Sequence, residues 1–258
     1  EMAIVFQKAM NALSPVHRIC TQIEDIYREH APKATRQQIK DRTMELFRMV
    51  GLPERVYRLY PHEVSGGMLQ RVAIVISLLH QPKLLVFDEA TTALDVVTQG
   101  QILEEIVRLE KNLNMTRIMI THDMSVVAAS CKKVAVMYAG KIVEYGTADD
   151  IFYDPRHPYT WALLSSMPDL DTKEKLDAIP GTPPNMIYPP EGDAFAARNK
   201  YAMKIDFEKQ PPMFQISDTH YAATWLLHPD APKVEMPKII VDRIQRMKEK
   251  NGGARDGE

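Results

Sequence analysis

The chain contains 258 residues, 45% of them hydrophobic and 26% charged, which suits one or two globular domains with a sizeable core. Its formal net charge of −2 provides no basic field, which argues against nucleic acid as a partner. No apolar run is long enough to span a bilayer, so any membrane association is expected to be peripheral. The two cysteines, Cys20 and Cys131, are far apart and have no metal-binding spacing, which excludes a disulfide scaffold.

The first eighty residues predict one strand followed by several helices. An apolar run at residues 2–6 is typical of a buried strand. Hydrophobic residues recur with helical spacing at 16–27, and Thr35 with Gln38 fits a capping box that opens a second helix. One face of that helix is apolar, through Ile39, Leu46, Phe47 and Val50. With a connector at 52–61 and a third helix at 65–79, residues 16–80 are interpreted as an inserted helical lobe.

Strands and helices then alternate. The largely apolar runs at 83–87 and 117–120 predict buried parallel strands. An amphipathic helix is expected at 98–109 and a further helix at 123–129. The runs at 134–138 and 142–145 flank the turn signal Ala139-Gly140, which favours a β-hairpin. Alternating strands and helices indicate an α/β fold with a parallel sheet.

The composition changes near residue 168, beyond which prolines recur and little periodicity remains. We therefore place a domain boundary there, between a domain at 1–168 and a loop-rich C-terminal extension at 169–258. A single helical pattern stands out in the extension, near residues 238–247.

Two adjacent carboxylates, Asp88 and Glu89, directly follow the apolar strand at 83–87. A strand-end carboxylate can simply cap the next turn, but two neighbouring carboxylates repel each other and stabilise little. A nucleotide-hydrolysing site needs such a pair, one carboxylate for Mg²⁺ and one to activate water. The pair therefore predicts catalysis more strongly than a structural role.

The turn Ser65-Gly66-Gly67 opens the third predicted helix. The plain interpretation is a serine N-cap followed by flexible glycines. Two glycines cost conformational entropy, however, and are explained better if a ligand approaches the backbone closely. Because a helix N-terminus attracts anions, the turn predicts a phosphate contact.

In this order and spacing, the motifs resemble the nucleotide-binding subunits of ABC transporters, which are ATPases with a P-loop-type α/β domain and an inserted helical lobe. The resemblance implies ATP and Mg²⁺ as ligands, with Asp88 as the Mg²⁺ carboxylate and Glu89 polarising the attacking water. It further implies that Gln7 senses Mg²⁺ and that His122 contacts the γ-phosphate. Asp95, in Ala93-Leu94-Asp95, resembles the D-loop residue that shapes the dimer interface, although it is equally compatible with an ordinary helix cap.

The same resemblance makes Ser65, Gly66, Gly67 and Met68 the signature that contacts nucleotide held by the opposite subunit. Val64 departs from the usual leucine, and Met68 stands where glutamine is common. Methionine at that position is frequent in the peptide-importer branch of the family. Segments of the extension, such as residues 155–160 and 179–185, resemble the tail of oligopeptide and dipeptide importer ATPases.

In that branch the tail often carries four cysteines that bind an iron–sulfur cluster. Alignment of the surrounding residues places these positions at Asp193, Asn199, Asp206 and Thr224. Because oxygen side chains are poor substitutes for thiolates, we expect no cluster. The polar replacements allow local hydrogen bonding or a site for a hard metal, and metal-free packing is the favoured interpretation.

The family's phosphate loop, G-x-x-x-x-G-K-[ST], lies upstream of these motifs and does not occur in this sequence. We therefore expect a truncated chain, inactive by itself, whose longer form hydrolyses ATP. The implied partners are a second ABC ATPase subunit, transmembrane permease subunits and, indirectly, a solute-binding protein, at the cytoplasmic face of the membrane. The alternatives are a soluble ABC-type ATPase in repair or translation, which would lack the tail, and a non-catalytic regulatory fragment.

Overall fold

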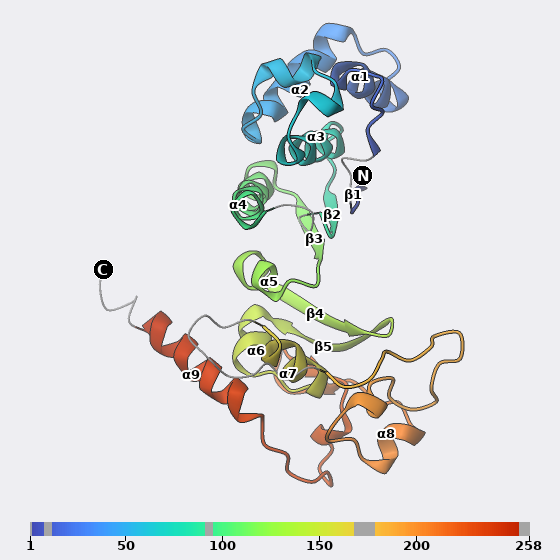
Figure 1. The fold of residues 1–258 in the computed structure, drawn as a ribbon, viewed down its shortest axis with the longest axis vertical. Coiled ribbons are helices and arrows are strands. Elements are labelled where there is room, and N and C mark those ends of the chain that lie inside the picture. The colour runs from blue at the N-terminus through green and yellow to red at the C-terminus, as the bar shows by residue number, and fades with distance from the viewer. Residues whose placement is uncertain (1, 8–11, 91–94, 168–178, 253–258) are drawn as a thin grey trace. The chain divides into compact units, whose positions relative to one another are not determined.

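The computed structural model describes residues 2–7, 12–90, 95–167 and 179–252 (Figure 1). The chain forms two compact units, Glu1–Val126 and Val127–Glu258. The expected domain boundary at residue 168 lies within the second unit, at a position outside the described residues, so it stays a prediction. No helix in the described ranges is long and apolar enough to cross a membrane.

The first unit is built on a parallel sheet of three strands. They are β1 (Met2–Val5), β2 (Leu84–Asp88) and β3 (Thr116–Ile120), in the order β1-β2-β3. The pairing runs in register from one strand to the next, so that all three carboxyl ends meet at one edge. The α/β fold with a parallel sheet is thereby confirmed.

The prediction of a fully buried strand at 117–120 was wrong. Ile118 and Ile120 in β3 remain 48% and 50% exposed, and burial alternates along the strand. The exposed residues alternate with half-buried ones, so the described residues cover only one face of β3. A continuous apolar run does not reveal how many of its faces are covered.

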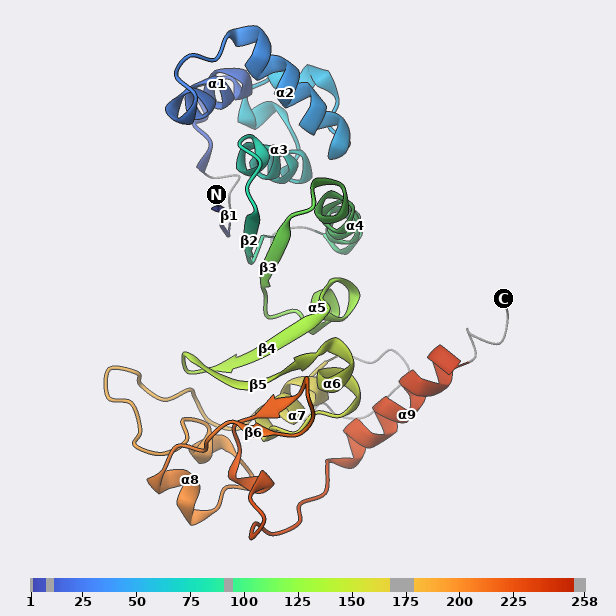
Figure 2. The ribbon, with the colours of Figure 1, turned by 180° about the vertical axis from the view of Figure 1, so that it is seen from behind.

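Helices flank these strands, and the first three of them lie within the lobe predicted at 16–80. These helices are α1 (Ile19–His30), α2 (Arg36–Met49), α3 (Gly66–Leu78) and α4 (Val96–Leu113). The predicted connector at 52–61 carries two short 3-10 helices, Glu54–Arg58 and Pro61–Glu63. In Figures 1 and 2, α1, α2 and α3 lie together at one end of this unit.

Capping and packing explain why α2 forms. Thr35 accepts the N–H of Gln38, and the Gln38 side chain accepts the N–H of Thr35, which confirms the capping box. The predicted apolar face is also confirmed, because its members are fully buried: Ile39, Leu46, Phe47 and Val50. They belong to the main core of the unit, which β1 and β2 reach through Val5 and Phe87.

The second unit contains an antiparallel sheet with the order β4-β5-β7-β6. The predicted hairpin is confirmed as β4 (Lys133–Tyr138) and β5 (Lys141–Thr147). Its two turn residues, Ala139 and Gly140, both have positive φ, 47° and 77°, as a tight hairpin turn requires. The other strands come from the C-terminal extension, namely β6 (Phe214–Gln215) and β7 (Tyr221–Ala222).

Helices precede, connect and follow these strands along the chain. They are α5 (Met124–Ser130), which leads into the unit, α6 (Ala148–Tyr153), α7 (Pro158–Ser165), α8 (Lys204–Glu208) and α9 (Lys238–Gly252). Two 3-10 turns, Ala196–Arg198 and Trp225–Leu227, complete the extension. α9 packs on α7 through Ile240, Ile244 and Trp161, which form a small core of their own.

Candidate active site

Glu89 occupies a strained turn at the carboxyl end of β2. Its backbone φ is 48°, a left-handed conformation that is uncommon for residues other than glycine. Its N–H donates to the carbonyl of Ile120 at 2.9 Å, which holds the turn against the end of β3. Asp88 and Glu89 are both half-buried. Strain of this kind in a carboxylate at a strand end is typical of functional sites.

The side chains of Gln7 and His122 converge on this carboxylate. Gln7 Nε2 donates to Glu89 Oε2 at 2.5 Å, and His122 Nδ1 lies 3.0 Å from Glu89 Oε1. The three residues follow β1, β2 and β3, so the parallel sheet brings them together from 82 and 33 residues apart. Gln7 and His122 are exposed, which leaves this edge accessible to a ligand.

The signature turn begins α3. Ser65 is the N-cap, and its Oγ accepts the N–H of Met68 at 3.3 Å. The other N–H groups in the first turn of an α-helix have no acceptor within the helix. A Cβ on Gly67 would lie 2.8 Å from Thr98 Cγ2 of α4. Close packing between α3 and α4 therefore accounts for one of the two glycines, without any ligand.

Asp95 caps α4. Its carboxylate accepts the backbone N–H of Thr98 at 3.0 Å and the Thr98 hydroxyl at 2.6 Å. The donated hydroxyl is the largest cause that lowers the pKa of Asp95 below its usual value. The other two residues of the D-loop motif, Ala93 and Leu94, lie outside the described residues. The helix-cap interpretation of Asp95 is thus confirmed, and its place at a dimer interface stays a prediction.

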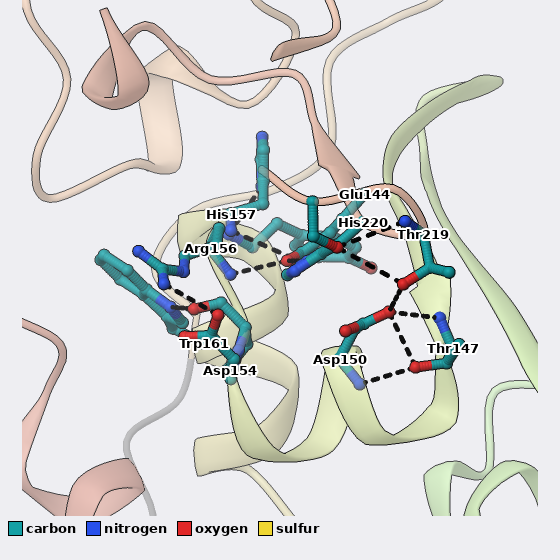
Figure 3. Close-up of polar contacts among 12 residues, drawn as sticks. Glu144, Thr147, Asp150, Asp154, Arg156, His157, Trp161, Thr219 and His220 are labelled. Atoms are coloured by element: carbon teal, nitrogen blue, oxygen red, sulfur yellow. Dashed lines mark hydrogen bonds and ion pairs between the residues drawn. The ribbon is translucent and has the colours of Figure 1, made fainter. Parts of the chain in front are cut away.

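A buried polar cluster in the second unit was missed by the sequence reasoning (Figure 3). Glu144 on β5 is fully buried, and its carboxylate accepts the backbone N–H groups of Arg156 and His157 at 2.6 and 3.1 Å. His220 Nε2 lies 2.8 Å from the same carboxylate. Beside it, Asp150 accepts the hydroxyls of Thr147 and Thr219. The sequence contained one signal for this cluster, namely Glu144 within an otherwise apolar strand pattern.

Comparisons with known proteins match two parts of the chain to protein families. The family described as ABC transporter matches residues 1–92. The family described as oligopeptide/dipeptide transporter, C-terminal region, matches residues 143–205. The first match contains the signature turn and the Asp88-Glu89 pair, and the second contains Glu144 and Asp150 but ends before Thr219 and His220.

Curated relatives match over nearly the whole chain. The oligopeptide transport ATP-binding protein OppD of Bacillus subtilis is 53% identical over 96% of this chain and 70% of its own length. The dipeptide transport ATP-binding protein DppD of Lactococcus lactis is 49% identical over 98% of this chain and 73% of its own length.

Solved structures with a similar fold are nucleotide-binding subunits. The cbiO1 protein of Clostridium perfringens, part of an ABC transporter complex, has a TM-score of 0.52 and 29% identity. The match covers 59% of each chain. The ATP-binding cassette MJ0796, dimeric and bound to ADP and Pi, has a TM-score of 0.50 and 26% identity, over 57% of this chain and 63% of that one.

The parallel sheet, the helical lobe and the carboxylate pair at the end of β2 define the class of ABC-type nucleotide-binding proteins, which hydrolyse ATP. Within that class, the chain belongs to the family of ATP-binding subunits of oligopeptide and dipeptide ABC transporters.

Proposed function

We propose that this protein is the ATP-hydrolysing subunit that powers uptake of peptides or related solutes through an ABC transporter. The convergence of Gln7 and His122 on Glu89 is the observation that supports hydrolysis most directly. The identity with oligopeptide and dipeptide transport proteins supports the peptide class of cargo.

The residues at the strand edge have separate roles in this proposal. Asp88 holds Mg²⁺, directly or through water. Gln7 follows β1, at the same carboxyl ends of the strands, and provides a further oxygen ligand. Glu89 polarises the attacking water, because its carboxylate is an acceptor fixed by the turn. His122 contacts the γ-phosphate, to which its exposed ring has access.

The signature turn serves a second ATPase subunit. Ser65, Gly66, Gly67 and Met68 begin a helix, whose first-turn N–H groups and dipole favour a phosphate. In the proposed dimer that phosphate belongs to nucleotide held by the partner, and Asp95 lies near the interface between the subunits. The second subunit is either another copy of this chain or a related ATPase.

The remaining partners are transmembrane permease subunits and, through them, a solute-binding protein. The subunit itself is peripheral, at the cytoplasmic face of the membrane. The matched C-terminal region of oligopeptide and dipeptide transporters, which contains β5, α6 and α7, favours this role over that of a soluble ATPase in repair or translation. No nucleic acid partner is proposed.

Replacing Glu89 by glutamine in the assembled transporter tests the proposal. Glu89→Gln keeps the shape and the hydrogen bond with Gln7 but removes the base, so we expect turnover to fall at least about 100-fold while ATP binding persists. The measurements are steady-state phosphate release, equilibrium ATP binding, and peptide uptake into vesicles.

The matched control is Glu29→Gln, at an exposed glutamate in α1 of the helical lobe, which should leave all three measurements unchanged. Near-normal hydrolysis by Glu89→Gln would contradict the assigned base. Normal ATP-driven uptake of peptide without this subunit would contradict the transport role and leave the hydrolysis result standing.

A further inference from the structure

The four positions that the resemblance aligns with cluster cysteines each accept a hydrogen bond from a nearby backbone N–H. Asp193 Oδ1 accepts the backbone N–H of Phe195 at 3.1 Å. Asn199 Oδ1 accepts the N–H of Tyr201 at 2.9 Å. Each side chain therefore closes a turn that spans two residues, which is a typical use of aspartate and asparagine.

The other two positions cap short helices. Asp206 Oδ2 accepts the N–H of Met203 at 2.7 Å, at the start of α8. Thr224 Oγ1 accepts the N–H of Leu226 at 3.3 Å and is the N-cap of the 3-10 turn that follows. All four side chains thus satisfy a backbone donor within their own turn.

Three of these side chains are also buried, with exposed fractions of 8% for Asp193 and 2% for Asp206 and Thr224. Asp193 and Asp206 meet through the backbone, where the N–H of Asp193 donates to the carbonyl of Asp206 at 2.6 Å. A Cβ on Gly192 would lie 2.1 Å from that same carbonyl oxygen. The turns are therefore packed against each other and leave no room even for a methyl group at Gly192.

The oxygen-bearing side chains at these four positions do not fit an iron–sulfur cluster, which requires cysteine thiolates as ligands. In the described ranges, no three His, Cys, Asp or Glu residues are grouped so that they could hold a metal ion. Cys20 lies in α1 of the first unit, and Cys131 directly follows α5, so neither is near these turns in the sequence.

We propose that the C-terminal extension of this protein is a metal-independent module, in which Asp193, Asn199, Asp206 and Thr224 close by hydrogen bonding the turns that relatives tie to a cluster. The extension consequently keeps its fold without iron and does not respond to oxidants or iron chelators. These properties belong to the extension alone, whether or not the protein has the proposed transport function.

The electrostatics of the pair favour an uncharged acceptor at these positions. Burial raises the pKa of both Asp193 and Asp206, and the charge of Asp206 raises that of Asp193 further. A negative charge at either position therefore costs stability. An amide at these positions keeps an acceptor oxygen without the charge, which suits a cap and weakens a metal site.

The experiment compares Asp206→Asn, Asp206→Ala and the unchanged protein, each with and without an iron chelator. We expect no stoichiometric metal in any of them and no effect of the chelator on the melting temperature. Asp206→Asn should melt within about 2 °C of the unchanged protein, and Asp206→Ala about 2–4 °C below it, as for a lost helix cap.

The exchange rate of the Met203 amide measures the capping hydrogen bond directly. In Asp206→Ala the Met203 amide should exchange about five-fold faster or more, and in Asp206→Asn it should stay protected. Asp218→Ala, at an exposed aspartate of the same extension, is the matched control and should change neither measurement. Two results on metal would overturn the proposal: stoichiometric iron or another bound metal, and a melting temperature lowered by the chelator. Two results on the variants would do the same: an unchanged exchange rate of the Met203 amide in Asp206→Ala, and a loss of stability in Asp206→Asn as large as that in Asp206→Ala.

Discussion

His157 shows how burial changes the chemistry of a single residue. Its ring is fully buried, and Nδ1 accepts the N–H of Tyr159 at 3.0 Å, which makes it the N-cap of α7. Burial lowers the pKa of His157 to about 3, so the ring is neutral in the folded protein. In the unfolded chain the same ring titrates near its usual value of 6.5.

This difference predicts a pH dependence of stability. Because the folded-state pKa lies below the unfolded one, the stabilisation is fully present above pH 6.5 and is lost as the pH falls from 6.5 towards 3. The loss approaches about 1.4 kcal/mol per pH unit below 6.5. His157→Asn keeps a capping oxygen but does not titrate, so its unfolding free energy should vary less with pH over this range.

Denaturant unfolding at several pH values measures the effect, with His228→Asn, at an exposed histidine, as the control. The raised pKa values of Asp193 and Asp206 act in the opposite direction but are common to all variants, so the difference between profiles isolates His157. Parallel profiles for His157→Asn and the unchanged protein would refute the assignment.

At the scale of elements, the start of α3 combines two requirements. Gly67 must lack a side chain because Thr98 of α4 is too close, while Ser65 caps the helix. Gly66 is the first residue of α3 and directly follows the cap. Its role in the proposed function is to let the partner's phosphate approach the helix N-terminus.

A mixed complex with Gly66→Asp in this subunit alone tests that role. An aspartate there would face the γ-phosphate bound by the partner, so hydrolysis at the partner's phosphate loop should fall by about 100-fold or more. ATP binding at the other site should survive. The measurement is single-turnover phosphate release from the two sites, with Gly100→Asp as the control because a Cβ at Gly100 meets open space. Normal hydrolysis at the partner's site would exclude action in trans.

At the scale of the whole chain, one buried carboxylate ties the extension to the hairpin that precedes it in sequence. Glu144 on β5 receives donors from the start of α7 and from His220, next to β7 (Figure 3). β5 also pairs directly with β7, and Gly146 allows Asp150 and His220 to approach. The second unit is therefore held together by contacts between segments about 76 residues apart.

His220→Ala should destabilise this unit strongly. Removing one partner leaves Glu144 buried with fewer donors, which typically costs about 3–5 kcal/mol. We expect the second unit to unfold at lower denaturant concentration, seen as a loss of protection of β7 in hydrogen exchange. His228→Ala serves as the exposed control. An unchanged midpoint in His220→Ala would show that the pair does not hold the extension.

The sequence by itself determined the features that depend on neighbouring residues. The capping box at Thr35, the hairpin turn at Ala139-Gly140 and the serine cap of α3 were predictable because the chemistry of each lies within four residues. The carboxylate pair at the end of β2 was predictable for the same reason, since an apolar strand and its terminal residues are read together.

Only the tertiary structure decided which distant groups meet. It brought Gln7 and His122 to Glu89, left β3 exposed on one face, and buried Glu144 with His220. It also revealed that Asp193, Asn199, Asp206 and Thr224 each accept a backbone N–H within their own turn. Burial and long-range hydrogen bonds depend on how the whole backbone folds, and no local pattern of residue types records which segments will cover a side chain.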